Sequence, residues 1–292
     1  MAESPDLPEP AVSRDEYHRG YYLESCAGAA QWRESGGRAP SGLYRGMLAL
    51  AGLRPGEAVV DIGTGRGELV AVAIEQGAAR ATGVDYSPAA VELARETLAA
   101  HEMDERAAVM LADARAIPLP DGDADLVTLL DVVEHLSPEE LRVALAEAFR
   151  LLRPGGRVFV HTMPNRLIYD VTYRIQRALW PPRWTRWPAD PRAEVERTMH
   201  VNEQTVRSLR RALRGAGFGQ VRGEYGQWLH TSFVPSQRAQ RLYPKLARWR
   251  LTSPLGACDL FAQAVRPPGA ASSPVIVTAS PCTTHDGGEW QS

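Results

Sequence analysis

The sequence predicts an α/β protein with a doubly wound, mostly parallel seven-stranded sheet. Short apolar runs alternate with helix-length amphipathic stretches, which is typical of β-α-β units around a parallel sheet. Start and stop signals also punctuate the helices, and acidic residues end several strands. The expected strands are Ala58–Ile62, Arg80–Val84, Ala107–Leu111, Leu126–Leu130, Arg157–His161, Gln220–Tyr225 and Cys258–Val265.

Three of the helices have clear start signals. Ser87-Pro88 supplies an N-cap and a first-turn proline. The run Ser137-Pro138-Glu139-Glu140 has the spacing of a capping box, and Pro154-Gly155-Gly156 is expected to end that helix. We expect Asn202 to cap a third helix, which Gly215 ends.

The 292 residues are 44% hydrophobic and 23% charged, an ordinary composition for a globular protein. Composition and pattern divide the chain into a flexible tail, a single domain and a disordered tail. The domain is expected to begin with helices and to carry a helical cap after its fifth strand. The expected limits are 1–12 for the first tail, 13–266 for the domain (13–56 helices, 57–165 core, 166–200 cap, 201–266 last part of the sheet) and 267–292 for the second tail.

Cellular location follows from what the chain lacks. It has no run of about 18 apolar residues that could span a membrane, and its first thirty residues do not resemble a signal peptide. Cys26, Cys258 and Cys282 show neither disulfide nor zinc-site spacing. We therefore expect a cytoplasmic protein without stable membrane insertion and without a bound metal. The oligomeric state stays open, a homodimer included.

Charge is divided unevenly along the chain. Residues 1–165 carry a net charge of −11, whereas residues 166–250 carry +11. Such a division indicates an anionic partner or surface for the later block. The alternative is a solvated, arginine-rich face, because Lys245 is the only lysine of the chain.

A glycine-rich turn, Asp61-Ile62-Gly63-Thr64-Gly65-Arg66-Gly67, follows the first strand. Glycines there permit unusual backbone angles and let a ligand lie against amides at a helix N-terminus. A dinucleotide fingerprint needs its third glycine five positions after the first, but Gly67 follows Gly63 by four. A P-loop is excluded because no Gly-Lys-Ser/Thr follows.

Acidic residues end the next three strands. Asp85 ends the second strand, where its carboxylate can accept hydrogen bonds from two ribose hydroxyls. Asp113 ends the third strand, in a place to meet an adenine amino group, and Asp131 ends the fourth. Because the carboxyl ends of parallel strands meet at one edge of a sheet, we expect one ligand site there.

Taken together, these motifs resemble the class I S-adenosylmethionine-dependent methyltransferases between Ala58 and Val160. The resemblance rests on the glycine-rich turn with Gly-Val-Asp-Tyr-Ser, Ala-Asp-Ala, Pro-Leu-Pro-Asp-Gly, Glu-His-Leu and Leu-Arg-Pro-Gly-Gly. It implies a Rossmann-like fold and S-adenosyl-L-methionine as the cofactor. The residues that it assigns to cofactor binding are Asp61, Gly63, Thr64, Gly65, Asp85, Tyr86, Asp113, Ala114 and Asp131.

The resemblance also implies a role for individual positions. Gly63 and Gly65 would leave room for the methionine moiety, and Asp61 would hold its amino group. Asp85 would bind the ribose. Asp113 and the Ala114 amide would bind the adenine, while Asp131 would contact the methionine end through its backbone.

Two histidines on the same edge are candidate catalytic residues. Methyl transfer needs mainly alignment of the acceptor and exclusion of water, but a hydroxyl acceptor usually needs a base as well. His135 follows the fourth strand, and its ordinary pKa of about 6.5 suits a proton acceptor. His161 ends the fifth strand. Alternatively, Glu134-His135 caps the next helix and closes the pocket wall, and His161 is a structural residue.

The expected cap, within Arg166–Met199, is rich in aromatic residues and arginine. A long segment at this edge of the sheet is usually functional, so Tyr169, Tyr173, Trp180 and Trp184 are candidate substrate-binding residues. Tyr21 and Tyr22 are candidates to close over the site from the N-terminal segment. Aromatic walls and arginines suit a partly apolar substrate, with or without an anionic group. The alternatives are a cap with its own small core, or a segment lying on a membrane surface.

The resemblance implies methyl transfer, and we expect the acceptor to be a small molecule, methylated on a hydroxyl of a specialised metabolite. Alternatives are methylation of a lipid-linked or cell-envelope saccharide and a non-catalytic cofactor-binding module. The segments Tyr17–Gly28, His161–Asn165 and His200–Glu203 resemble bacterial methyltransferases of small molecules and envelope saccharides. Leu130–Val133 lacks the Asn/Asp-Pro-Pro-aromatic tetrapeptide that holds a flipped base, which argues against DNA adenine methylation. A basic track is available in the chain, but we expect no nucleic-acid substrate.

Overall fold

The computed structural model describes residues 7–40, 42–179, 189–226 and 253–270, and in this part seven strands form one sheet in the order β3-β2-β1-β4-β5-β7-β6. The first five strands are parallel, and β7 runs antiparallel to both β5 and β6. The predicted doubly wound, mostly parallel sheet is confirmed. The strands are β1 (Ala58–Ile62), β2 (Arg80–Asp85), β3 (Ala107–Leu111), β4 (Ala124–Leu130), β5 (Leu152–Thr162), β6 (Gly219–Tyr225) and β7 (Leu260–Val265).

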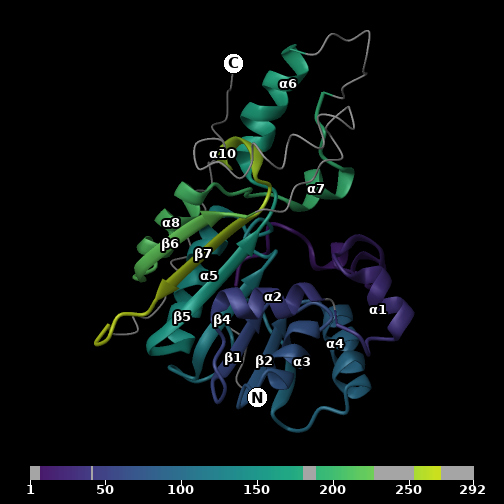
Figure 1. The fold of residues 1–292 in the computed structure, drawn as a ribbon, viewed down its shortest axis with the longest axis vertical. Helices are drawn as coiled ribbons and strands as arrows, with labels where there is room; N and C mark the ends of the chain where they lie inside the picture. The colour runs from purple at the N-terminus through teal and green to yellow at the C-terminus, as the bar shows by residue number, and fades with distance from the viewer. Residues whose placement is uncertain (1–6, 41, 180–188, 227–252, 271–292) are drawn as a thin grey trace, which may run out of the picture.

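Helices cover both faces of the sheet, and short helices lie beyond its upper end (Figure 1). Along the described ranges, no helix combines the length and the apolar character needed to cross a membrane. The helical elements are η1 (Arg14–Glu16), η2 (Tyr21–Ser25), α1 (Ala29–Ser35), α2 (Gly42–Ala51), α3 (Glu68–Glu75), α4 (Pro88–Ala100), α5 (Pro138–Leu151), η3 (Ile168–Tyr173), α6 (Arg174–Leu179), α7 (Glu194–Met199), α8 (Val206–Gly215) and α10 (Ser253–Gly256).

The alternation of strand side chains divides the core between the two faces. Val60 of β1 belongs to a buried cluster with Leu145 of α5 and Leu213 of α8. Its neighbour Val59 belongs to a second cluster with Leu48 of α2. A sheet buried on both faces is what continuous apolar strands require, and it fixes the carboxyl ends of β1, β2 and β4 at one edge.

Two helix boundaries differ from the sequence-based expectation. Ser87 and Ser137 are N-caps as predicted, and Ser137 forms the capping box. Asn202 is not an N-cap: Thr205 caps α8, and the Asn202 amide instead donates to the Glu134 carbonyl oxygen at 3.0 Å. The run Pro154-Gly155-Gly156 does not end α5, which stops at Leu151. These residues lie in β5, because distant pairing overrides the local turn signal.

The N-terminal segment packs on the domain before residue 13, so the predicted tail of residues 1–12 is too long. Val12 is only 5% exposed. The hydroxyl of Tyr86 donates to the Val12 carbonyl oxygen at 3.1 Å, and the hydroxyl of Ser87 donates to the Tyr17 carbonyl oxygen at 2.7 Å. The segment therefore lies across the tip of β2 and the start of α4.

Asn165 joins the segment after β5 to the segment before β7. Its side-chain amide donates to the carbonyl oxygens of Pro254, at 2.9 Å, and Ala257, at 3.0 Å. Its backbone amide donates to the carbonyl oxygen of Cys258 at 2.7 Å. The chain thus leaves β5 and enters β7 at the same edge of the sheet.

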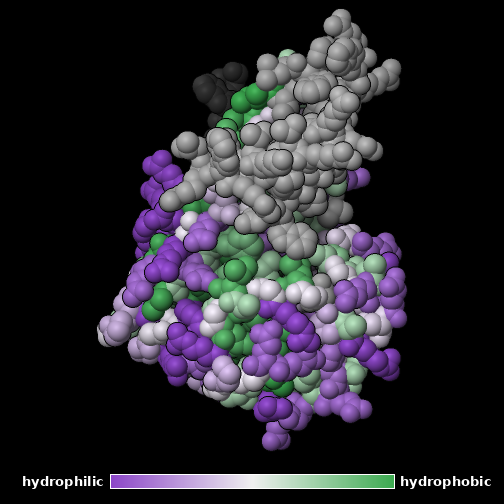
Figure 2. Space-filling view, viewed as in Figure 1, coloured by the Kyte–Doolittle hydropathy of each residue, from purple (hydrophilic) through white to green (hydrophobic). Residues whose placement is uncertain are grey.

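The described surface in Figure 2 is mixed. Hydrophobic residues gather over and around α2, where Leu50 is 57% exposed, and hydrophilic residues surround them. Helix α8 is strongly basic on its outer face, because Arg207, Arg211 and Arg214 are exposed. Part of the positive charge predicted for residues 166–250 is therefore on the surface.

Candidate active site

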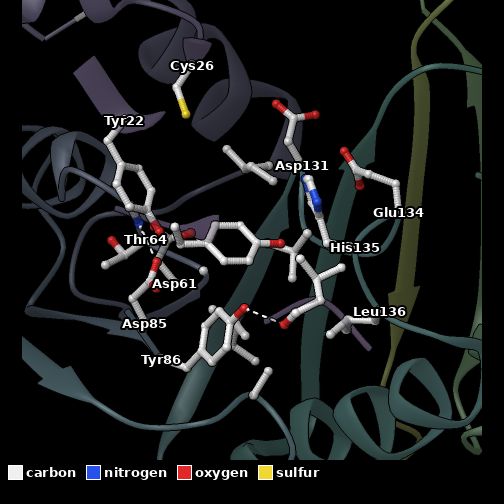
Figure 3. Close-up of a pocket in the computed structure, with 18 of the residues that line it drawn as sticks. Tyr22, Cys26, Asp61, Thr64, Asp85, Tyr86, Asp131, Glu134, His135 and Leu136 are labelled. Atoms are coloured by element: carbon white, nitrogen blue, oxygen red, sulfur yellow. Dashed lines mark hydrogen bonds between the residues drawn. The ribbon is translucent and has the colours of Figure 1, made fainter. Parts of the chain in front are cut away.

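A cavity of about 460 Å³ opens at the carboxyl ends of β1, β2 and β4. Its volume is within the range of about 300–1,000 Å³ that is usual for ligand sites. Figure 3 shows Asp61, Thr64 and Asp85 on one side, and Glu134 and His135 on the other. The N-terminal segment supplies aromatic side chains to the wall between them.

The turn after β1 needs glycine for both conformation and space. Gly63 has φ 75°, and a Cβ at this position would lie 2.3 Å from Cγ2 of Val132. Gly65 has φ 53°, and its amide donates to Asp85 Oδ2 at 2.9 Å. Because both glycines lack side chains, the backbone of the turn forms part of the cavity wall.

Two buried carboxyl groups line the side of the cavity next to this turn. Asp61 accepts a hydrogen bond from the hydroxyl of Thr128 at 2.6 Å. Asp85 accepts from the amides of Gly65 and Ser87, both at 2.9 Å. Burial raises the pKa of Asp61 and the pKa of Asp85 to about 6. The Tyr86 amide and the Tyr22 hydroxyl also bond to the Asp85 carboxylate.

The other predicted cofactor-binding residues lie on the same cavity. Thr64, Tyr86, Asp113 and Ala114 all line it. Asp113 is held by Arg115, whose Nε lies 2.9 Å from Oδ1 and whose Nη2 lies 2.8 Å from Oδ2. The hydroxyl of Tyr86 is used to hold Val12, as described above.

Asp131 and His161 are in close contact at the ends of β4 and β5. Asp131 has φ 53°, an unusual conformation for a residue with a side chain. Its Oδ1 lies 2.9 Å from Nδ1 of His161, which is 5% exposed. Burial alone would lower the pKa of His161, but the carboxylate of Asp131 outweighs it and places this pKa above its ordinary value.

His135 lines the cavity in a different electrostatic setting. Its Nδ1 lies 3.1 Å from the carbonyl oxygen of Met199, so this nitrogen carries the proton and donates. Burial, together with the neighbouring His200, lowers the pKa of His135 to about 4. The sequence-based expectation of an ordinary histidine pKa is therefore wrong for this position. Next to it, burial and the charge of Asp131 raise the pKa of Glu134.

Of the predicted substrate-binding residues that the structure describes, some line the cavity and others do not. Tyr21 and Tyr22 line the cavity. Tyr169 does not: its ring lies against the guanidinium of Arg192, 5.2 Å from centroid to carbon, and Tyr173 is 2% exposed in the interior. Trp180 and Trp184 lie outside the described residues.

Other cavity residues were missed as individual candidates. Tyr17 is 8% exposed and packs edge-on against the rings of Tyr86 and His135, at 5.3 and 5.8 Å. Cys26 and His200 also line the wall. The sequence signal for Tyr17 was its spacing from Tyr21 and Tyr22. Nothing in the sequence places His200 next to His135.

Arg66 connects the glycine-rich turn to the N-terminal segment. It is 4% exposed and pairs with Glu68 at 2.6 Å. Its two terminal nitrogens donate to the carbonyl oxygens of Tyr22 and Ala27, both at 2.6 Å. The aromatic wall of the cavity is therefore anchored to the turn that follows β1.

Comparisons with known proteins agree with this geometry. Residues 59–156 match the family described as "Methyltransferase domain". The chain is 30% identical over 141 residues to 27-O-demethylrifamycin SV methyltransferase of Amycolatopsis mediterranei, a match that covers 48% of each chain. It is 34% identical over 117 residues to malonyl-[acyl-carrier protein] O-methyltransferase of Serratia marcescens, which covers 40% of this chain and 42% of that one. The matches thus span about half the length of these relatives.

Solved structures share the fold at lower identity. The cyclase SpnF has a TM-score of 0.59 and 18% identity, over 90% of this chain and 99% of that one. Phosphoethanolamine N-methyltransferase 2 of Haemonchus contortus, solved with S-adenosyl-L-methionine, has a TM-score of 0.54 and 16% identity, over 77% of this chain and 52% of that one.

Fold and site together place a cavity lined by Asp61 and Asp85 at the carboxyl edge of a doubly wound sheet. Over residues 59–156 the chain is similar to the methyltransferase domain family, which agrees with S-adenosyl-L-methionine as the expected cofactor. The residues fit this cofactor, because the turn without side chains at Gly63 and Gly65 leaves space beside the carboxylate of Asp85.

Proposed function

We propose that this protein transfers a methyl group from S-adenosylmethionine to a hydroxyl of a small, partly apolar acceptor of specialised metabolism. The observation that carries the proposal is a single cavity that joins the cofactor-binding carboxylates to the Asp131–His161 pair. The name of one relative, 27-O-demethylrifamycin SV methyltransferase, supports this substrate class.

The chain's own residues hold the cofactor and align the acceptor. Asp85 would accept hydrogen bonds from the ribose hydroxyls, Asp61 would hold the amino group, and Gly63 and Gly65 would admit the methionine part. When bound, the cofactor supplies an activated methyl group on a sulfonium. Tyr17, Tyr21 and Tyr22 would exclude water from the reacting atoms, since all three are largely buried and line the cavity.

His161 is the better candidate for the base than His135. The contact of its Nδ1 with Asp131 leaves Nε2 to take the proton of the acceptor hydroxyl, and Asp131 stabilises the imidazolium that results. A pKa above the ordinary value makes His161 the stronger base, whereas His135, with a pKa of about 4, is a weak one. In this assignment His135 lines the acceptor side.

The test uses His161→Gln and Asp131→Asn, with His18→Gln as a control on the exposed surface. Methyl transfer is followed with tritium-labelled cofactor on a panel of hydroxylated polyketides, and affinity for S-adenosylhomocysteine is measured by calorimetry. We expect His161→Gln to lower turnover by about 10²–10⁴-fold with little change in affinity for S-adenosylhomocysteine. Unchanged turnover in His161→Gln would remove this residue from the mechanism.

Asp131→Asn gives a second readout. Without the carboxylate, the pKa of His161 should fall, so the rise of activity with pH should move to lower pH. An unshifted pH profile would show that Asp131 does not set the pKa of the catalytic base. The cyclase SpnF shares this fold, so the decisive measurement is the methylated product rather than cofactor binding alone.

A lipid-linked or envelope saccharide is the second candidate acceptor, and the exposed arginines of α8 favour it. Anionic carriers such as lipid phosphates would pair with this face. A requirement for anionic vesicles in the assay would support this acceptor, and full activity without them would support the small metabolite. The cytoplasmic location and a homodimer stay predictions.

A further inference from the structure

Three side chains from two separate loops converge on the acceptor side of the cavity. Glu134 and His135 follow β4, and His200 follows α7. One potential ligand atom from each residue lies within 4.8 Å of the other two, and all three residues line the cavity. The rings of His135 and His200 meet edge to face, with centroids 4.9 Å apart. The two loops are tied together by the Asn202 amide, which donates to the Glu134 carbonyl oxygen.

The first two of these side chains are oriented from behind by other groups. His135 donates through Nδ1 to the Met199 carbonyl oxygen, which leaves the lone pair of Nε2 available. The hydroxyl of Thr162 donates to Oε2 of Glu134 at 2.8 Å and fixes the carboxylate. Metal-binding histidines and carboxylates are usually held in this way, by a carbonyl or a hydroxyl outside the ligand set.

His200 carries an unexplained polar atom. Its Nδ1 is shielded from solvent and has no hydrogen-bond partner among the residues that the structure describes. Buried polar atoms are nearly always paired, and a bound ion or a water would supply the partner that this atom lacks. Asp131 and Glu196 line the same cavity and add negative charge around the cluster. Arg192, the nearby cation, is held by Asp190 and Glu203 at 3.0 and 3.1 Å.

We propose that Glu134, His135 and His200 bind a divalent transition-metal cation of the zinc type, with an open coordination position that faces the cavity. Two imidazoles and one carboxylate are a ligand set that suits zinc and cobalt better than magnesium or calcium. Zinc–ligand distances of about 2.0–2.1 Å place tetrahedral ligands about 3.3 Å apart, so the three atoms must close by up to about 1.5 Å. Side-chain rotation provides this movement.

A cation there gives the acceptor hydroxyl a second contact. An oxygen bound at the open position would be polarised and would lose its proton more easily. The base assigned to His161 and the cation would then act on the same oxygen. The site departs from the sequence-based expectation of no metal, because His135 and His200 are 65 positions apart and no local spacing reveals the pair. Metal binding itself does not depend on methyl transfer.

The experiment is a titration of the purified full-length chain, treated with a chelator, with cobalt(II). We expect one equivalent to give the visible absorption of cobalt bound to nitrogen and oxygen ligands, and zinc to displace it. His200→Ala should weaken cobalt binding by more than about 100-fold, since even outer residues of metal sites contribute 10–100-fold. Glu134→Gln keeps the shape of the side chain and should weaken binding as well. His18→Ala, which removes an exposed histidine outside the cluster, should not.

Calorimetry with S-adenosylhomocysteine on each variant reports whether the domain is folded. A folded protein that shows no cobalt absorption at millimolar metal would overturn the site. Unchanged cobalt binding in both His200→Ala and Glu134→Gln would overturn it too, because the metal would then bind elsewhere. Cobalt binding without methyl transfer would leave the site standing and refute the proposed function instead.

Discussion

The close approach of Gly63 to Val132 predicts a large cost for a single added methyl group. In Gly63→Ala the new Cβ would lie 2.3 Å from Cγ2 of Val132, whereas carbon atoms in contact are normally about 3.5–4.0 Å apart. A φ of 75° adds about 1–2 kcal/mol for a residue with a side chain. Overpacking adds about 1–3 kcal/mol. We expect the free energy of unfolding to fall by about 2–5 kcal/mol.

Gly52→Ala is the matched control. Gly52 has φ 67°, but an added Cβ would have no atom within 4 Å. It should therefore show only the conformational cost of about 1–2 kcal/mol. Both variants are compared by equilibrium urea unfolding and by calorimetry with S-adenosylhomocysteine, for which Gly63→Ala should have the weaker affinity.

Val132→Ala separates the two contributions. Added to Gly63→Ala, it removes the clashing methyl group and should recover the overpacking part of the loss, a coupling that a double-mutant cycle measures. Equal stability of the Gly63→Ala and Gly52→Ala variants would refute the argument. So would the absence of coupling between Gly63 and Val132.

Two further predictions concern buried charge. Arg66→Met removes the buried guanidinium that pairs with Glu68 and donates to two carbonyl oxygens, and should lower the free energy of unfolding by about 3–5 kcal/mol. Arg45→Met, in the exposed pair with Glu75, should lower it by about 0–1 kcal/mol. Similar losses in thermal or urea unfolding of both variants would contradict this. Because burial raises the pKa of Asp85 in the folded state from 3.8 to about 6, its contribution favours the fold at low pH and is lost as pH rises through 6. Binding of S-adenosylhomocysteine needs the carboxylate and should weaken as pH falls below about 6. Asp85→Asn should bind more weakly and with a smaller pH dependence, because Asp61 also has a pKa of about 6 and stays in place. An unchanged pH dependence in that variant would exclude Asp85 as a source.

The sheet could be predicted from the sequence because its strands are short apolar runs between clear helix signals. The start of β5 could not. Pro154-Gly155-Gly156 has the local chemistry of a turn, yet the Gly155 amide donates to the Arg266 carbonyl oxygen, and the Arg266 amide donates to that of Gly156. A partner more than a hundred residues away decides the conformation of this segment.

The site residues also fall into those that the sequence could predict and those that it could not. Asp61, Asp85 and Asp131 were predictable because the topology of parallel strands brings their carboxyl ends together. Tyr169 was expected at the cavity only because the segment Arg166–Met199 is rich in aromatic residues and arginine, but it packs against Arg192 instead. His200 reaches the cavity only because the loop after α7 is fastened to the loop after β4. Loop positions of this kind depend on packing that no local pattern encodes.

The clamp that Asn165 forms with Pro254 and Ala257 has an evolutionary consequence. Residues 166–199 depart from the sheet beside the point where the chain comes back to it in front of β7. The strands that carry Asp61 and Asp85 pair with each other and with β3 and β4, so length changes in this excursion should leave the registers of β1 and β2 unchanged. Related proteins could therefore evolve specificity for different acceptors through changes in residues 166–199, while the strands that carry Asp61 and Asp85 stay the same.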